Sequence, residues 1–207
     1  MAEVILNKIK EHIKDNLFSY IFLWAFFIIG VLFGGYILNS YKEEDAKGLI
    51  TFFDDALLLF NQGTPNYNLI FKNTFFTSIK TVAFIWILGF TVAGLPVIFF
   101  INSKLGFMLG FVCSFLFSAY SYKGILYGAT LIFSQCFIYV PLIFTVSVYA
   151  VSLSFTLTKM LFGKIRYKMN FKYYILNYLT VLCVTAIVTL LYSLCEAYLT
   201  SNILMLI

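Results

Sequence analysis

The stretch LFSYIFLWAFFIIGVLFGGYIL, residues 17–38, decides the fold class because it is apolar over its whole length. As an α-helix it extends over about 33 Å, which is enough to cross the hydrocarbon core of a bilayer. The rest of the chain is similar in character. Of its 207 residues, 62% are hydrophobic, 20% aromatic and only 11% charged, whereas a soluble domain has about a quarter charged residues. The composition predicts an all-α polytopic membrane protein and excludes soluble, disordered and disulfide-rich secreted proteins.

Further apolar runs predict four more spans, about five transmembrane helices in all. Their expected ranges are Ser78–Ile101, Leu105–Tyr120, Gly124–Thr158 and Tyr173 to about Leu199. We expect a break between the second and third spans at Asn102-Ser103-Lys104. The run from Gly124 is too long for one crossing, and Pro141 lies in its middle. Proline disrupts a helix, so this run is either a short or re-entrant helix followed by a full span, or one long kinked helix.

Three segments lie outside the expected spans of this single membrane domain, 1–207. Residues 1–16 form an amphipathic lead, and residues 159–172 form a basic loop. Residues 39–77 form a longer polar segment that contains apolar residues at helical spacing. We interpret it as including an interfacial helix with Asp54 and Asp55 on its polar face. The apolar face is expected to pack on the membrane or the bundle, leaving both acids for the cell wall or a partner.

The basic residues predict the orientation. With five crossings, nine of the 14 Lys and Arg residues lie on the side of the N-terminus. These nine are Lys8, Lys10, Lys14, Lys104, Lys159, Lys164, Arg166, Lys168 and Lys172, and the other five are Lys42, Lys47, Lys72, Lys80 and Lys123. The positive-inside rule then places the N-terminus in the cytoplasm and the C-terminus outside. Basic residues flank apolar runs, which favours contact with membrane lipid and not with nucleic acid.

Small residues recur every fourth position in three of the expected spans. The sets are Gly30 and Gly34; Gly106, Gly110, Ser114 and Ser118; and Thr185, Thr189, Ser193 and Ala197. Such ribbons allow close approach of helices in lipid. They predict either packing within one subunit or a homodimer.

Polar residues inside the expected spans are few. Glu196 is the only ionisable one, near the outer end of the last span, and Gln135 lies six residues before Pro141. An intramembrane ionisable residue is a candidate functional residue. Glu196 is therefore either a structural or partner-binding carboxylate, with Lys80 or Lys123 as candidate ion-pair partners, or an interfacial group that reaches water.

The sequence predicts no enzyme, cofactor or metal site. The single histidine, His12, lies outside the spans, so neither a zinc-binding HExxH pair nor a Ser–His dyad can form in the bilayer. No paired intramembrane aspartates and no phosphate-binding glycine loop occur. The four cysteines lie in apolar runs, which is typical of thiols buried as small apolar side chains.

Three passages carry a resemblance to a known family. The first is YIFLWAFFIIGVLFGGYILNS, residues 20–40, and the second is IWILGFTVAGLPVIFFINSKLGFMLGF, residues 85–111. The second contains Gly89, Gly94, Leu95-Pro96, Gly106 and Gly110. The third is CEAYLTSNILMLI, which begins at Cys195 and contains Glu196. From about Leu17 onward, the chain resembles the stage II sporulation protein M family of endospore-forming bacteria.

The resemblance implies a non-catalytic scaffold for forespore engulfment in the mother-cell septal and engulfing membrane. The implied partners are stage II sporulation proteins D and P. Both degrade peptidoglycan, protein D as a lytic transglycosylase and protein P as an amidase/endopeptidase. Wider relatives often carry a His and a Glu before the second proline, whereas this chain has Ser134-Gln135 before Pro141. The alternative is a small transporter or exporter-permease-like subunit, which Gln135 and Pro141 favour because broken helices near proline can build a substrate site.

Overall fold

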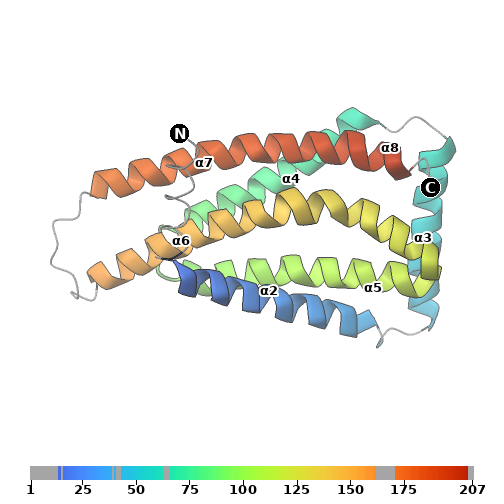
Figure 1. The fold of residues 1–207 in the computed structure, drawn as a ribbon, viewed down its shortest axis with the longest axis horizontal. Helices are drawn as coiled ribbons and strands as arrows, with labels where there is room; N and C mark the ends of the chain where they lie inside the picture. Colours follow the sequence, from blue (N-terminus) through green and yellow to red (C-terminus); the bar gives the residue numbers. More distant parts are fainter. Residues whose placement is uncertain are drawn as a thin grey trace.

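The computed structural model describes residues 14, 16–38, 40, 43–62, 66–161 and 171–204, and this part of the chain is helical (Figure 1). The long helices are α2 (Leu17–Leu38), α3 (Glu43–Gln62), α4 (Tyr67–Leu88), α5 (Gly94–Ser134), α6 (Val140–Leu161) and α7 (Phe171–Cys195). A π-helical turn, η1 (Gln135–Tyr139), joins α5 to α6. A second, η2 (Glu196–Thr200), joins α7 to the short α8 (Ser201–Leu204). Nearly all of the predicted N-terminal lead, and residues 162–170 of the predicted basic loop, lie outside the described residues.

Three described stretches are long and apolar enough to cross a membrane: Leu17–Leu38, Gly94–Met160 and Tyr178–Leu199. The all-helical membrane fold is thereby confirmed, while the number of five crossings stays a prediction. The middle stretch has 67 residues, more than one crossing can use. It reverses direction at Ser121, whose backbone angles (φ 48°, ψ −118°) are non-helical. These angles are typical of the first central residue of a type II′ turn.

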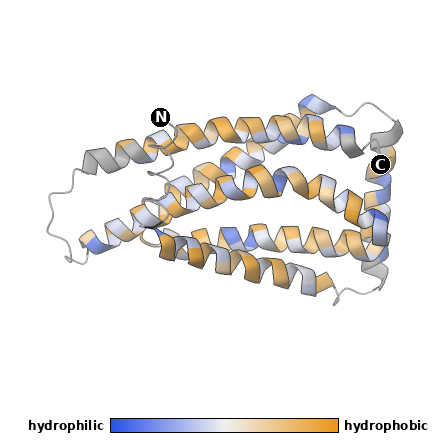
Figure 2. Ribbon diagram, viewed as in Figure 1, coloured by the Kyte–Doolittle hydropathy of each residue, from blue (hydrophilic) through white to orange (hydrophobic). Residues whose placement is uncertain are grey.

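The bundle has two ends, which Figure 1 places at its left and right. We call the left one the Gly89 end, since the turn between α4 and α5 lies there. We call the right one the Ser121 end, where α5 reverses and α3 lies across the helix ends. Figure 2 shows hydrophobic residues along the long helices and prominent hydrophilic residues on α3. This distribution is that of a membrane bundle with an amphipathic helix at one end.

The predicted break at Asn102-Ser103-Lys104 is wrong, because α5 continues through these residues. The chain turns instead between Leu88 and Gly94, where the amides of Thr91 and Gly94 donate to the carbonyls of Leu88 and Thr91. A Cβ atom at Gly94 would overlap the Leu88 carbonyl oxygen, so the tight turn needs glycine at this position. Pro96 lies in the first turn of α5, where a missing amide hydrogen costs no helical bond; it does not end the preceding span.

The helix that contains the expected second span begins earlier than Ser78 and is not among the three stretches that are apolar enough to cross a membrane. Helix α4 starts at Tyr67 instead of Ser78, so residues 67–77 belong to this helix and not to the polar segment predicted over residues 39–77. Asn66 caps this helix, because its side-chain oxygen accepts a hydrogen bond from the Leu69 amide at 3.1 Å.

The stretch around Pro141 is one long helix with a local irregularity, the second of the two predicted alternatives. Within η1 the helix widens, and the Val140 amide donates to the Gln135 carbonyl five residues earlier. Proline cannot supply a helical amide hydrogen. The wide turn just before Pro141 therefore accommodates the proline without a break in the chain of helices.

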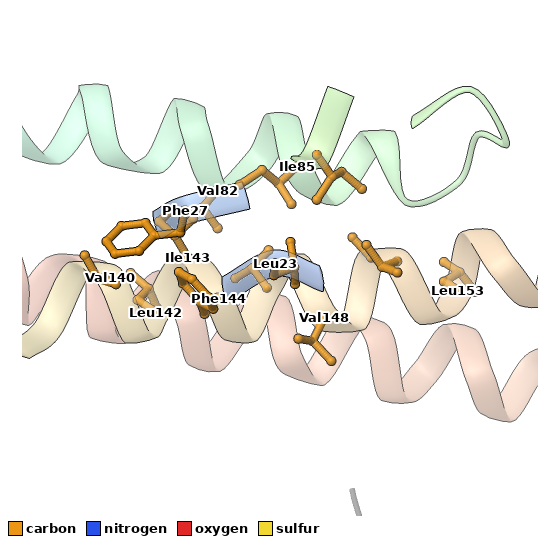
Figure 3. Packing of buried hydrophobic residues seen from close by; sticks show 14 of the residues in the cluster. Leu23, Phe27, Val82, Ile85, Val140, Leu142, Ile143, Phe144, Val148 and Leu153 are labelled. Carbon is orange, nitrogen blue, oxygen red and sulfur yellow. The ribbon is translucent and has the colours of Figure 1, made fainter. Parts of the chain in front are cut away.

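Helix α6 lies at the centre of the bundle and contacts α2, α4, α5 and α7. Figure 3 shows apolar side chains of α2, Leu23 and Phe27, between those of α4 and those of α6. The labelled core residues are Leu23, Phe27, Val82, Ile85, Val140, Leu142, Ile143, Phe144, Val148 and Leu153.

All four cysteines are free, but Cys113, Cys136 and Cys183 are exposed on the outside of the bundle. The prediction that they are buried is therefore wrong.

Candidate functional site

The two π-helical turns meet near the Ser121 end of the bundle. Ser134, the last residue of α5, is buried, and its hydroxyl donates to Oε2 of Glu196, the first residue of η2. Glu196 itself is half-buried. π-Helical turns occur frequently at functional sites. We therefore take the residues around this hydrogen bond as the candidate site.

Two stacked tyrosines extend this site toward α4. The rings of Tyr139 and Tyr192 are 4.9 Å apart and nearly parallel, with an angle of 21° between their planes. The Tyr139 side chain also lies next to the Ser78 and Thr81 side chains of α4. We call Ser134, Tyr139, Tyr192 and Glu196 the π-turn cluster. Its members belong to α5, η1, α7 and η2.

An apolar pocket of about 310 Å³ lies beside the π-turn cluster. Phe133, Ile138 and Leu199 contribute to its lining, and Ser134 borders it. Gln135, the other polar residue singled out in the sequence, begins η1 and is half-buried. The pocket therefore offers mainly apolar surface, with the hydroxyl residues Thr130 and Ser134 in its lining.

The small-residue ribbon of α7 is buried. Thr185, Thr189, Ser193 and Ala197 are each at most 4% exposed. The hydroxyls of Thr189 and Ser193 donate to carbonyls four residues earlier in α7. Because these hydroxyls are satisfied within their own helix, the ribbon presents a smooth surface on which neighbouring helices pack.

Tyrosines close the contact between α4 and α7 at both ends. The Tyr178 hydroxyl donates to the Trp86 carbonyl at 2.9 Å. At the other end, Tyr67 stacks on Tyr198 with 5.2 Å between ring centroids. The Tyr67 hydroxyl donates to Asn202 Oδ1 at 2.8 Å. These contacts fix α4 antiparallel to α7.

The glycine ribbons of α2 and α5 face each other within the chain. A Cβ atom added at Gly30 would overlap the Ser103 carbonyl oxygen, and one at Gly34 would overlap that of Phe107. The relation is reciprocal, since Gly106 lies against the Phe27 carbonyl and Gly110 against that of Val31. The two helices therefore touch backbone to backbone, which corresponds to the prediction of packing within one subunit.

Gly89, at the end of α4, also permits a close contact. A Cβ atom there would overlap the Tyr178 hydroxyl and crowd Ala150.

Helix α3 packs on the hairpin of α5 through one aromatic side chain. The ring of Phe53 lies 5.4 Å from that of Tyr120 and about 6 Å from those of Phe115 and Tyr127. Asp54 is exposed, and its Oδ1 accepts a hydrogen bond from the Tyr120 hydroxyl at 2.8 Å. Asp55 is exposed. The expectation that both acids of α3 face the cell wall or a partner stays a prediction.

Sequence reasoning missed two buried hydrogen-bonding residues. Ser134 was not expected as the partner of Glu196, for which Lys80 or Lys123 had been considered; within the described residues the carboxylate forms no ion pair with either lysine. Asn102 is fully buried and donates through Nδ2 to the Ile98 carbonyl and to Ser147 Oγ at 2.8 Å. Its Oδ1 has no partner in the described part of the chain. A polar residue inside an apolar run could have indicated an interhelical bond.

Two of the lysines in the described helices lie far from any helix end or turn. These are Lys80 in α4 and Lys104 in α5, and both are exposed on the outside of the bundle. Because Lys104 lies in the apolar stretch Gly94–Met160, the prediction that Glu196 is the only ionisable residue within the spans is wrong.

Comparison with known proteins identifies one family. The family model described as Stage II sporulation protein M matches residues 23–201, a range that begins within α2 and ends at the start of α8. No curated protein and no solved structure matches the chain.

Proposed function

Because the chain belongs to the stage II sporulation protein M family, a family of sporulation-related membrane proteins, we propose that it is a non-catalytic membrane scaffold. In this role it recruits peptidoglycan hydrolases to the sporulation septum and to the engulfing membrane. The observation that carries the proposal is the family match over residues 23–201, which includes nearly all of the described bundle. The proposed partners are stage II sporulation proteins D and P.

The proposed topology has five crossings: α2, α4, the arm of α5 before Ser121, the arm after it together with α6, and α7. Consecutive members of this series run in alternate directions in Figure 1. Lys80 and Lys104 lie in the middle of helices, so neither is counted as a residue at the membrane surface. The number of basic residues on the two sides of the membrane then changes from nine against five to eight against four. The excess still favours a cytoplasmic Gly89 end and an external Ser121 end.

Under this orientation α3 lies on the outer surface of the membrane, facing the cell wall. Phe53 holds α3 on the α5 hairpin, while Asp55 stays exposed. A rigid helix held at the membrane surface is a suitable platform for extracellular hydrolase domains. Its position therefore supports the scaffold proposal.

The alternative of a transport subunit has less support. Transporter sites are built from interrupted helices whose unwound backbone faces the substrate. Between Tyr122 and Leu161 the chain is helical throughout, and η1 widens the helix before Pro141 without unwinding it. Gln135 and Pro141, the residues that favoured transport, therefore lie in continuous helix.

Affinity purification from sporulating cells tests the scaffold proposal. The tagged full chain, solubilised in mild detergent, is expected to retain stage II sporulation proteins D and P. A tagged polytopic protein from the same membrane, expressed at the same level, serves as the control. Recovery of a nucleotide-binding ATPase without either hydrolase would refute the scaffold and favour transport.

A further inference from the structure

The outward face of α4 carries polar side chains where a lipid-facing helix would be apolar. Asn73, Thr77 and Lys80 follow each other at i, i+4 and i+7, and all three are exposed. This spacing puts them on one face of the helix. Ser78, Val82 and Ile85 are the buried residues of the same helix. We call Asn73, Thr77 and Lys80 the α4 stripe.

The ammonium group of Lys80 cannot reach either end of α4. Lys80 is eight residues from Leu88 and thirteen from Tyr67, which correspond to about 12 Å and about 20 Å along the axis. Helical side chains lean toward the N-terminus, so Lys80 leans away from the nearer end. Its aliphatic stem spans roughly 6 Å. Lys72, in contrast, is close to Tyr67 and leans toward it.

Lys80 also has no counter-ion within the described part of the chain. Glu196 is engaged by Ser134. It lies near Tyr198, which stacks on Tyr67 at the far end of α4 from Leu88. Charged residues within a span are costly unless they pair, and almost always face a partner or a water-filled cavity. The α4 stripe is therefore an incomplete surface.

We propose that the α4 stripe docks a membrane-spanning helix of a different protein, which brings an aspartate or glutamate to Lys80. A carboxylate complements the unpaired ammonium, and a helix is the element that can accompany α4 through lipid. Thr77 and Asn73 provide hydrogen-bonding groups beside the ion pair, and the exposed rings of Phe76 and Phe84 provide apolar contact.

A second copy of this chain does not fit the same surface. In a two-fold symmetric contact the same residues meet each other, so the lysines of the two copies would be brought together. Like charges repel, and the one acid described within the spans is already bonded to Ser134. The proposal rests on the scaffold function, which supplies a membrane-anchored partner, and on the proposed crossing of the membrane by α4, which is outside the three stretches that are apolar enough to cross alone.

Photo-cross-linking in sporulating cells tests the docking surface. The photoreactive amino acid benzoylphenylalanine replaces Thr77 in the full chain, and mass spectrometry identifies the adduct. We expect an adduct with a spanning segment that contains Asp or Glu. Lys80→Leu should lower its yield at least tenfold, whereas Lys80→Arg should retain it. Replacement of the partner's acid by leucine should cause the same loss as Lys80→Leu.

Lys104→Leu is the matched control, because Lys104 is also an exposed lysine within a helix but its exposed neighbours on α5, Phe100 and Met108, are apolar. It should leave the yield unchanged. Lys80→Leu makes α4 more apolar, so it should not impair insertion, and equal protein levels verify this. An adduct with a second copy, adducts with lipid alone, or an unchanged yield in Lys80→Leu would each overturn the proposal.

The outcomes separate this proposal from the scaffold function. An acidic spanning partner that is not a hydrolase, together with failure of both hydrolases to co-purify, would retain the docking surface and refute the hydrolase scaffold. Hydrolases that still co-purify with Lys80→Leu, at an unchanged cross-linking yield, would retain the scaffold and refute the docking surface.

Discussion

Alanine at Gly106 should force α2 away from α5, because a Cβ atom there meets backbone and not a side chain. It would overlap the Phe27 carbonyl oxygen and lie 3.1 Å from the Val31 amide nitrogen. Backbone atoms of a helix cannot rotate aside as the end of a flexible side chain can. The strain must therefore be relieved by separation of the two helices, which loses the close packing that holds helices together in lipid.

Gly128 offers a matched control in the same helix. It is also buried, but a Cβ atom there would lie 3.7 Å from Leu116 Cδ1, an ordinary van der Waals distance. Gly→Ala within a helix gains about 1 kcal/mol in propensity, and this gain cancels between the two variants. Overpacking costs about 1–3 kcal/mol. At 2–4 °C per kcal/mol for a chain of this size, the Tm of Gly106→Ala should be roughly 2–12 °C below that of Gly128→Ala.

Thermal unfolding followed by fluorescence-detected size exclusion, in one detergent and at one protein concentration, measures this difference. Gly110→Ala should behave like Gly106→Ala, since its Cβ atom would lie 2.9 Å from Val31 Cα. If Gly106→Ala melts at or above the temperature of Gly128→Ala, the backbone contact of α2 with α5 does not limit stability, and the reasoning fails.

Three further predictions concern the packing of α3, the hydrogen bond of Glu196 and the orientation of the bundle. Phe53→Asp should reduce the yield of monodisperse protein several-fold because it puts a charge among aromatic rings, whereas Asp54→Asn keeps a hydrogen-bond acceptor and should not; equal yields would contradict this. Glu196→Gln should retain the wild-type Tm and Glu196→Ala should lose about 0.6–2 kcal/mol, the value of one hydrogen bond between helices in lipid; loss of hydrolase co-purification in the Gln variant alone would show that charge matters. In a background without native cysteines, Asn202→Cys should react with an impermeant maleimide on intact cells and Thr91→Cys should not; the reverse labelling would invert the orientation.

The sequence was sufficient to predict the helical class, the first span and the presence of close-packing glycine ribbons, because these depend on composition and on spacing within single helices; it did not predict that the ribbons of α2 and α5 face each other. It misplaced the second turn. Residues 89–93, Gly-Phe-Thr-Val-Ala, contain neither a charge nor a proline, so hydropathy gives no boundary there. The polar Asn102-Ser103-Lys104 was interpreted as that boundary. In the structure Asn102 instead bonds Ser147 across the bundle, a contact 45 residues away in the chain.

At the Ser121 end of the bundle, the sequence likewise predicted a helix but not its contacts with distant residues. The spacing of apolar residues predicted an amphipathic helix around Phe53, and α3 has that form. The hydrogen bond from Tyr120 to Asp54 joins residues 66 positions apart. It depends on the reversal of α5 at Ser121, which brings Tyr120 under α3. Local pattern could therefore predict the helix but not which of its acids the bundle would engage.

The buried ribbon of α7 continues through the π-helical turn that follows it. Small residues recur at every fourth position from Thr185 to Ser201, and all five are nearly or fully buried. In a regular α-helix each step of four residues rotates the face by about 40°, so the three steps from Thr185 to Ala197 drift by about 120°. A π-helical turn takes more than four residues, so the last step, which lies within η2 (Glu196–Thr200), rotates the face in the opposite sense and offsets part of this drift. The offset keeps Ser201 on the buried side of the bundle with Ala197.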